Sequence, residues 1–138
     1  MAPMPSSGSP APDLAAHYRA YLACLNDRAW SDLALHVDDD VIYNGDHVGL
    51  TGYREMLQRD VREVPDLQFN PGLLVVQTPI VAARLDFDCR PRGRFLGLEV
   101  NGRRIAFSEN VFYEFAGPQI IEVWSVIDKA AVESQLPR

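Results

Sequence analysis

Two neighbouring stretches near the C-terminus, RIAFSENVFYEF (residues 104–115) and QIIEVWSVI (residues 119–127), decide the fold. Both are rich in β-branched and aromatic residues, and Gly117-Pro118 between them is a turn signal. They therefore predict two long antiparallel strands joined by a tight turn. Because adjacent residues in both stretches are apolar, we expect both faces of this sheet to be covered. Helices can cover one face, and curvature, the C-terminal segment or a second subunit can cover the other.

The rest of the chain divides into a helical first half and a β-rich second half. Helical periodicity predicts a helix starting near Asp13, a short helix that Ser31 can cap, and a third helix from Thr51 to Pro65. A short strand, a final helix after Asp128 and further strands complete the pattern, with the strands expected at 41–43, 67–77, 80–88 and 95–98. Helices followed by an antiparallel meander predict one α+β domain over residues 13–138.

Composition limits the possible partners. With 47% hydrophobic residues the 138-residue chain can build a core, and its net charge of −6 argues against nucleic-acid binding. No apolar run approaches the ~20 residues that a membrane span needs. Residues 1–12 lack the basic start and apolar centre of a signal peptide, so we interpret them as a disordered tail and expect a cytoplasmic protein.

The run Arg84-Leu85-Asp86-Phe87-Asp88 is the most informative local pattern for chemistry. Strand alternation puts Arg84, Asp86 and Asp88 on one face and the two apolar residues on the other. In one interpretation this is a solvated face with an exposed ion pair. In the other it lines a pocket, where Arg84 keeps Asp86 ionised and neighbouring acids raise the pKa of one carboxyl group. The pattern does not choose between them.

Glu109 is a second candidate because it shares strand parity with Phe107, Val111, Tyr113 and Phe115. A carboxyl group on such an apolar face keeps its proton or finds a partner such as Arg84, and either state makes it a usable general acid or base. A bulge that turned Glu109 to solvent would remove this role.

Polar residues at the end of the first strand could orient a ligand. Tyr43 and Asn44 can direct a water molecule or a substrate oxygen, although Asn44-Gly45 is also an ordinary turn. The histidines and the acidic residues around them do not have the spacing of a dedicated metal site, so we expect a solvated acidic turn. We expect neither a metal nor a cofactor.

Several short motifs resemble one known family. They are NVFYEF (110–115), IIEVWSVID (120–128), SQL (134–136), GRFLG (93–97) and GLTGY (49–53). In this order they are similar to the SnoaL-like polyketide cyclase (ester cyclase) family, over roughly residues 13–136. The resemblance implies the α+β cone shared with scytalone dehydratase, ketosteroid isomerase and nuclear transport factor two. In that fold a strongly bent sheet encloses a hydrophobic cavity, and dimers are common.

The resemblance also implies a catalytic position that this chain does not keep. The characterised cyclases use an aspartate on the last strand as acid/base for an aldol ring closure, and that position is Ser125 here. The pKa of a hydroxyl group is too high to replace a carboxylate as a base. Arg84-Leu85-Asp86 and Tyr43 partly resemble limonene-epoxide-hydrolase-like enzymes, but their second aspartate again falls on Ser125, and Asn44 is displaced by one residue from their amide.

The leading hypothesis is a cofactor-independent acid/base enzyme acting on a small, largely apolar polyketide- or terpenoid-like molecule by cyclisation, isomerisation, dehydration or epoxide opening. The predicted catalytic residues are Asp86, Arg84, Glu109 and Tyr43, and the predicted substrate-binding residues are Ser125, Tyr113, Val123, Val111, Trp30 and Asn44. The alternatives are a binding or accessory protein that lost its chemistry, and an interaction module that uses the face carrying Arg84 and Asp86. A homodimer through the sheet is expected.

Overall fold

The computed structural model describes residues 13–137 as helices packed on one mixed sheet. The tail expected over residues 1–12 lies outside the described residues. Three N-terminal helices are present, α1 (Leu14–Asn26), the 3₁₀ helix η1 (Trp30–Leu35) and α2 (Gly49–Glu63). The side chain of Asp13 caps α1 by accepting a 3.1 Å hydrogen bond from the Ala16 N–H, as its position before the apolar stripe predicts. Helix α2 begins two residues before the predicted start.

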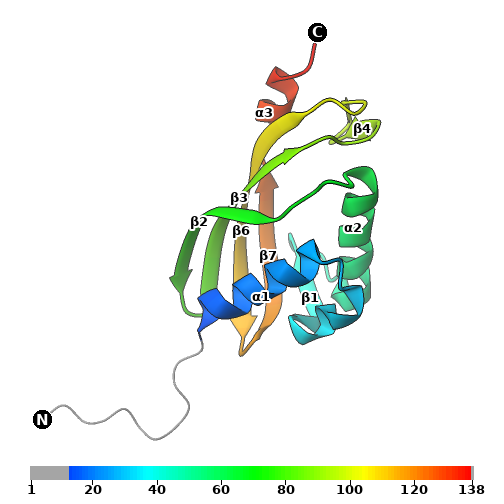
Figure 1. Ribbon diagram of the computed structural model, residues 1–138. Helices are drawn as coiled ribbons and strands as arrows, with labels where there is room; N and C mark the ends of the chain where they lie inside the picture. Colours follow the sequence, from blue (N-terminus) through cyan, green and yellow to red (C-terminus); the bar gives the residue numbers. More distant parts are fainter. Residues whose placement is uncertain (1–12, 138) are drawn as a thin grey trace, which may run out of the picture.

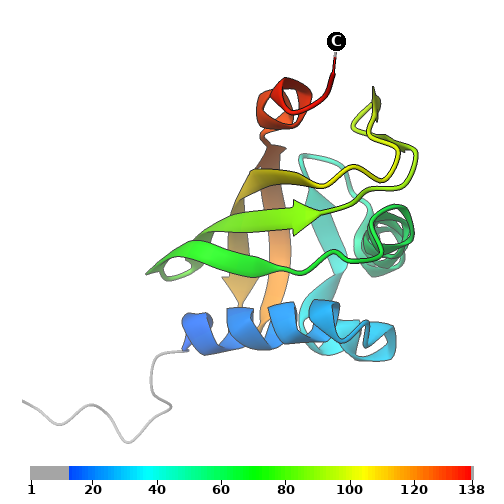
Figure 2. The same ribbon diagram turned by 45° about the horizontal axis from the view of Figure 1, so that its top comes forward.

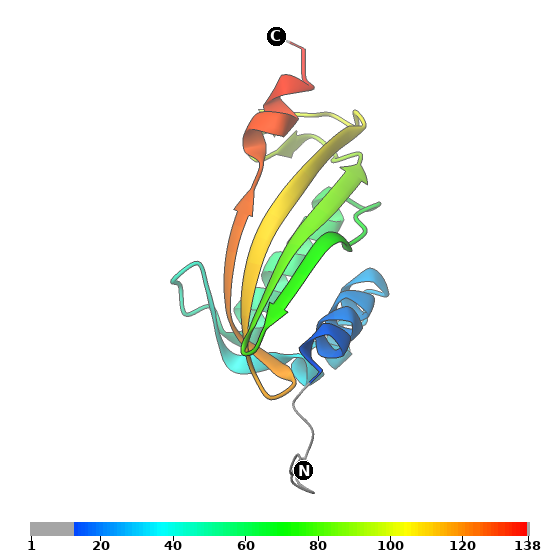
Figure 3. The ribbon, with the colours of Figure 1, turned by 90° about the vertical axis from the view of Figure 1, so that its left-hand side faces the viewer.

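The main sheet has five strands in the order β1-β7-β6-β3-β2. These are β1 (Val37–Tyr43), β2 (Asn70–Gln77), β3 (Ile80–Cys89), β6 (Ile105–Ala116) and β7 (Gln119–Ile127). The pair β1–β7 is parallel and the other pairs are antiparallel, so the sheet is mainly antiparallel. Helix α1 crosses the sheet and α2 lies beside β1 (Figure 1). The strands bend, and both helices lie on the same side of the sheet (Figure 3).

The far end of the sheet carries a small hairpin and the last helix. The single strand expected at 95–98 is wrong, because β4 (Arg94–Phe95) and β5 (Leu98–Glu99) are two short strands of a hairpin. Leu96 and Gly97 between them both have positive φ, 54° and 76°, as a tight two-residue turn requires. The hairpin and α3 (Lys129–Ser134) lie at the same end of the sheet, away from α1 (Figure 2).

The two faces of the sheet differ sharply in burial. Along β3, Leu85, Phe87 and Cys89 are buried while Arg84 and Asp86 are exposed. The buried face belongs to the core that α1 and α2 cover, and we call it the inner face; the other is the outer face. Within the described part of the chain, no helix is both long enough and apolar enough to cross a membrane.

Candidate active site

A cavity of about 40 Å³ lies between the inner face of the sheet, α1 and α2. It is far smaller than the roughly 300–1,000 Å³ that is usual for ligand pockets, and it has room for a few water molecules at most. Its lining combines apolar side chains with four tyrosines and two carboxyl groups. The lining residues are Tyr21, Leu25, Tyr43, Tyr53, Met56, Leu57, Asp60, Phe69, Leu85, Glu109, Val111, Tyr113 and Val123.

Glu109 projects from β6 into this cavity, on the face that strand parity predicts. The sequence left open whether it points inward or a bulge turns it to solvent. No bulge is present at Glu109, since it pairs in regular register with Leu85 of β3 and Ile127 of β7. The Ser125 hydroxyl of β7 donates a hydrogen bond to Oε2 of Glu109. Burial raises the pKa of Glu109, and the hydrogen bond from Ser125 opposes this rise because it stabilises the ionised form.

Tyrosine side chains form much of the cavity wall. The hydroxyl groups of Tyr21 and Tyr53 are 2.6 Å apart, and the Tyr18 hydroxyl donates to that of Tyr113 at 3.3 Å. Burial raises the pKa of all four phenols, so they are neutral over the physiological range. Because these hydroxyls are paired, Tyr21, Tyr53 and Tyr113 keep the wall polar without placing a charge in the core, and Tyr18 pairs with Tyr113 without lining the cavity.

Tyr43 differs from these four because it is only partly buried, at the end of β1. Burial raises the pKa of Tyr43, and a hydrogen bond with the Ser125 side chain partly offsets the rise. Tyr43 therefore lies beside Glu109 and Ser125 as a neutral phenol that can donate a hydrogen bond to an oxygen atom in the cavity.

Asp60 is a lining residue that the sequence prediction missed. It lies on α2 one turn after Leu57 and two turns after Tyr53, on the same side of the helix. Burial is the main cause that raises its pKa to about 7, and the negative charges of Glu109 and Glu63 raise it further, while Arg59 lowers it. The available signal was its position within the apolar stripe of the third predicted helix, between Leu57 and Val64.

Arg84 and Asp86 do not face the interior cavity; they line a shallow, open depression of about 290 Å³ on the outer face, together with Ser108 and Asp128. Their side chains are 52% and 60% exposed, and the closest ion-pair distance, Arg84 Nε to Asp86 Oδ1, is 3.9 Å. Ser108 bridges the pair, since its hydroxyl accepts from Arg84 Nε and donates to Asp86 Oδ1, both at 3.2 Å. Arg84 also cannot partner Glu109, because it pairs with Asn110 and points to the outer face.

Of the six predicted substrate-binding residues, three line the cavity, whereas Ser125, Asn44 and Trp30 are not among its lining residues. Val111, Tyr113 and Val123 line the cavity. Asn44 does not line it, because its side-chain amide accepts from the Ser125 N–H at 2.8 Å and donates to the Ser125 carbonyl at 3.2 Å. Asn44 therefore extends the β1–β7 pairing and holds the backbone of Ser125 in place. Trp30 begins η1 and packs against the core, also outside the cavity lining.

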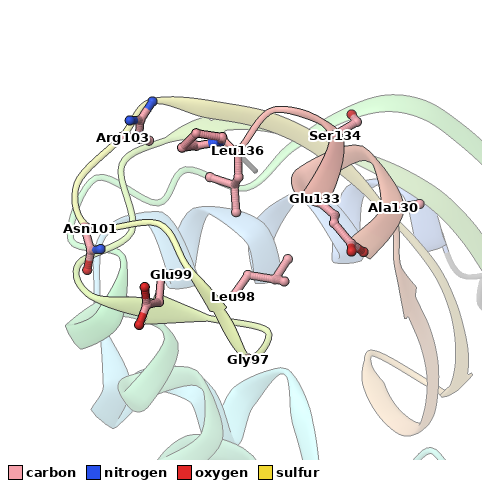
Figure 4. A pocket seen from close by; sticks show the side chains of 10 residues that line it. Gly97, Leu98, Glu99, Asn101, Arg103, Ala130, Glu133, Ser134 and Leu136 are labelled. Atoms are coloured by element: carbon pink, nitrogen blue, oxygen red, sulfur yellow. The ribbon is translucent and has the colours of Figure 1, made fainter.

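A larger, open crevice of about 960 Å³ separates the β4–β5 hairpin from α3 (Figure 4). Leu98 and Leu136 extend into it, and exposed side chains such as Glu99, Arg103 and Glu133 surround them. It shares no lining residue with the interior cavity. A row of phenylalanines connects the two regions, from Phe69 at the cavity through Phe87 and Phe107 to Phe95 on the hairpin, with ring centroids 5.2–5.7 Å apart.

The bent sheet, the helices on one side of it and the carboxyl groups enclosed between them define an α+β protein of the cone-shaped type. The chain belongs to the SnoaL-like polyketide cyclase family, whose model matches residues 15–136. The resemblance and the fold class expected from the sequence are thereby confirmed. No curated protein matches the chain in sequence.

Solved structures agree with this assignment. The chain is 49% identical to a SnoaL-like polyketide cyclase from Agrobacterium tumefaciens, with a TM-score of 0.88 over 90% of this chain and 98% of that one. Two more distant structures share the fold. The putative polyketide cyclase IdmH from Streptomyces antibioticus is 16% identical, with a TM-score of 0.75 over 89% of this chain and 97% of that one. The putative hydroxylase AclR from Streptomyces galilaeus is 20% identical, with a TM-score of 0.74 over 91% of this chain and 98% of that one.

Proposed function

We propose that this protein is a cofactor-independent acid/base enzyme that acts on a small, largely apolar substrate, with Glu109 as its acid/base group. The single observation that carries the proposal is the position of the Glu109 carboxyl group, which faces the interior cavity and accepts a hydrogen bond from Ser125. A carboxyl group whose pKa is raised by burial is suited to accept and return a proton near neutral pH.

Glu109 can also account for the missing acid of the family. The resemblance puts the aspartate of the characterised cyclases at position 125, where this chain has serine. The Ser125 hydroxyl contacts the Glu109 carboxyl group, so β6 supplies a carboxyl group to the part of the cavity where β7 would otherwise present one. In this proposal Ser125 keeps a supporting role, because its hydrogen bond orients Glu109 and favours the ionised, basic form.

Tyr43 completes the proposed site. Its phenol can donate a hydrogen bond to a carbonyl or epoxide oxygen while Glu109 removes or delivers a proton. The reactions that fit are the ring closures, isomerisations and epoxide openings in which a proton moves next to an oxygen that gains negative charge. Polyketide- and terpenoid-like molecules carry such groups on an apolar skeleton.

The small cavity restricts how a substrate binds. With about 40 Å³ available, a reacting group larger than a few atoms enters only if part of the wall moves. Met56 is the lining residue most suited to this, since it is partly buried and has an unbranched, flexible side chain. The same small volume favours a second candidate function, a binding or accessory protein without turnover.

Two simple reactions test the proposal. Deuterium uptake at the α-carbon of cyclohexanone reports proton abstraction, and hydrolysis of cyclohexene oxide reports ring opening. We expect the wild-type protein to accelerate at least one of them, and Glu109→Gln to reduce that rate by about 100-fold or more. Asp86→Asn should keep the rate, because Asp86 lies on the outer face.

The outcomes separate the two candidate functions. A Glu109→Gln variant that stays folded and fully active would contradict the assignment of Glu109. A wild-type protein that accelerates neither reaction, yet binds the ketone and releases it unchanged, would favour the binding protein.

We also propose that the chain forms a homodimer through the outer face. Phe112 and Val126 are 51% and 70% exposed there, and Leu73 and Val75 of β2 are exposed on the same sheet. Cross-strand register makes one apolar row of Val75, Ala82, Phe112 and Trp124. Leu73 and Val126 lie in a neighbouring row, in which Arg84 and Asn110 stand between them. Exposed apolar residues in such a contiguous group are typical of protein interfaces.

Sedimentation analysis tests the homodimer directly. We expect the wild-type protein to sediment with twice the mass of the chain, and Phe112→Arg to sediment as a monomer. Leu35→Arg is the matched control, because Leu35 is an exposed apolar residue that belongs to η1 and not to a strand. A monomeric wild-type protein, or a Phe112→Arg variant that still dimerises, would contradict this interface.

A further inference from the structure

Asp60 faces the cavity from α2, on the wall opposite the sheet that carries Glu109. It is partly buried beside Met56 and Leu57. In the part of the chain that the structure describes, no group donates a hydrogen bond to its carboxyl, and the ion pairs found there involve other residues. Asp60 is not among the sealed, unsatisfied polar groups, since none is present in the described residues, so its carboxyl oxygens keep access to solvent. A partly buried carboxyl group that lines a mainly apolar cavity is a candidate for proton transfer.

We propose that Asp60 is a second catalytic residue, which protonates the substrate oxygen from α2 while Glu109 takes a proton from the substrate on the sheet side. This inference rests on the proposed acid/base function and deepens it. It assigns the substrate to molecules that carry an oxygen acceptor, a ketone or ester carbonyl or an epoxide, next to the group that loses a proton.

The hydrogen bonds decide which carboxyl group is the acid and which is the base. Ser125 donates to Glu109, and a donor stabilises the ionised form, so Glu109 is the base. Asp60 has no such donor, so it keeps its proton more readily and is the acid. Its pKa of about 7 agrees with this division, and the negative charge of Glu109 contributes to that value.

The charged and titratable groups around Asp60 come from three elements. Glu63 and Arg59 lie on α2 itself and have opposite effects on its pKa, Glu109 faces it from β6, and Tyr43 lies on β1. Glu63 and Arg59 are exposed, so solvent weakens their influence. Glu109 is the charged group that shares the enclosed cavity with Asp60.

The proposed step balances its protons. For a ketone, the C–H bond at the α-carbon breaks and its proton moves to the Glu109 carboxylate, while the proton of Asp60 moves to the carbonyl oxygen. The product is an enol, and the step leaves Glu109 protonated and Asp60 ionised. Return of the Glu109 proton to the α-carbon, with return of the hydroxyl proton to Asp60, completes an exchange that leaves the ketone unchanged. If the ketone is β,γ-unsaturated, the enol is a conjugated dienol, and return of the Glu109 proton to its γ-carbon completes an isomerisation.

A titration tests the coupling of the two groups without any turnover. Protein carrying aspartate labelled with ¹³C at the side-chain carboxyl is followed by NMR against pH, and Asp60→Asn assigns the Asp60 signal. We expect the Asp60 midpoint near 7 in the wild-type protein and about one pH unit lower in Glu109→Gln. Glu55→Gln is the control, since Glu55 is an exposed acid on the same helix, and it should leave the midpoint unchanged.

Turnover then tests the catalytic role. With the ketone, we expect Asp60→Asn to lower kcat by at least about tenfold and to remove the decline in rate that wild type shows above pH 7. Glu55→Gln should keep both the rate and the decline. An Asp60 midpoint at the ordinary value, or one unaffected by Glu109→Gln, would overturn the inference.

The results distinguish a failure of the role proposed for Asp60 from a failure of the proposed acid/base function. If Asp60→Asn keeps the full wild-type rate and pH profile while Glu109→Gln loses activity, the inference about Asp60 fails and the proposed function stands. A wild-type protein that is inactive on both test reactions overturns both.

Discussion

The inner and outer faces of the same sheet place their acidic side chains in opposite physical conditions. On the outer face, Asp86 and Asp88 lie in water beside Arg84 and Arg104, and Arg104 donates 2.6 and 2.7 Å hydrogen bonds to Asp88. On the inner face, Glu109 is enclosed with one hydroxyl donor, and Asp60 faces the same cavity from α2. The outer face carries more charges, but its charge–charge interactions are weaker, because solvent screens each charge.

Enclosure therefore decides which carboxyl groups are suited to proton transfer. Exposed ion pairs contribute about 0–1 kcal/mol and leave carboxyl groups ionised at neutral pH. A carboxyl group in the cavity instead acquires a pKa close to the pH at which protons must move, as the value of about 7 for Asp60 illustrates. An Arg-x-Asp pattern is conspicuous in the sequence, but its position on the outer face leaves it without an enclosed volume.

The largest expected difference between the two faces is in stability, and it is measured at two neighbouring residues of β3. Leu85 is 1% exposed and lines the cavity, so Leu85→Ala should lower the free energy of unfolding by about 2–5 kcal/mol. Arg84→Ala on the outer face should lower it by less than about 1 kcal/mol. Urea denaturation of both variants at one protein concentration measures the difference. Equal losses would contradict the division into a buried and a solvated face.

A smaller effect follows from the charge of Asp60. Its pKa is about 7 in the folded protein against an ordinary value of 3.8, so the folded state binds more protons than the unfolded state between these values. The stability that this group contributes is present below about pH 4 and is lost as pH rises toward 7. Asp60→Asn carries no charge there, so relative to wild type it should gain on the order of 1–2 kcal/mol between pH 5 and pH 8.

Thermal unfolding of wild type and Asp60→Asn across this pH range measures the effect. Glu55→Gln should follow the wild-type curve, because Glu55 is exposed on the same helix. An Asp60→Asn variant whose stability relative to wild type did not change with pH would show that Asp60 is solvated like the acids of the outer face.

Much of the secondary structure follows from local patterns in the sequence. The apolar stripe after Asp13 predicted α1, and the alternation along residues 104–115 predicted β6 and put Glu109 on the same face as Phe107 and Val111. These predictions succeeded because helical and strand periodicity are properties of a few consecutive residues. The hairpin at residues 94–99 was missed, since Leu96 adopts a positive φ that its side chain gives no reason to expect.

The composition of the interior cavity depended on contacts between distant segments. Strand alternation separated Arg84 and Asp86 from Leu85, but it could not say which set faced the helices. The register that pairs Leu85 with Glu109 decides this, and it joins residues that are 24 positions apart in the chain. Asp60 likewise enters the site only because α2 packs with that side toward the sheet.

The sequence by itself thus determined most of the elements, the family and the two faces of each long strand. Only the tertiary structure decided which face is enclosed and which carboxyl groups lie within it. The physical reason is that alternation is a local property of the backbone, whereas the desolvation that changes a pKa comes from residues brought together by folding.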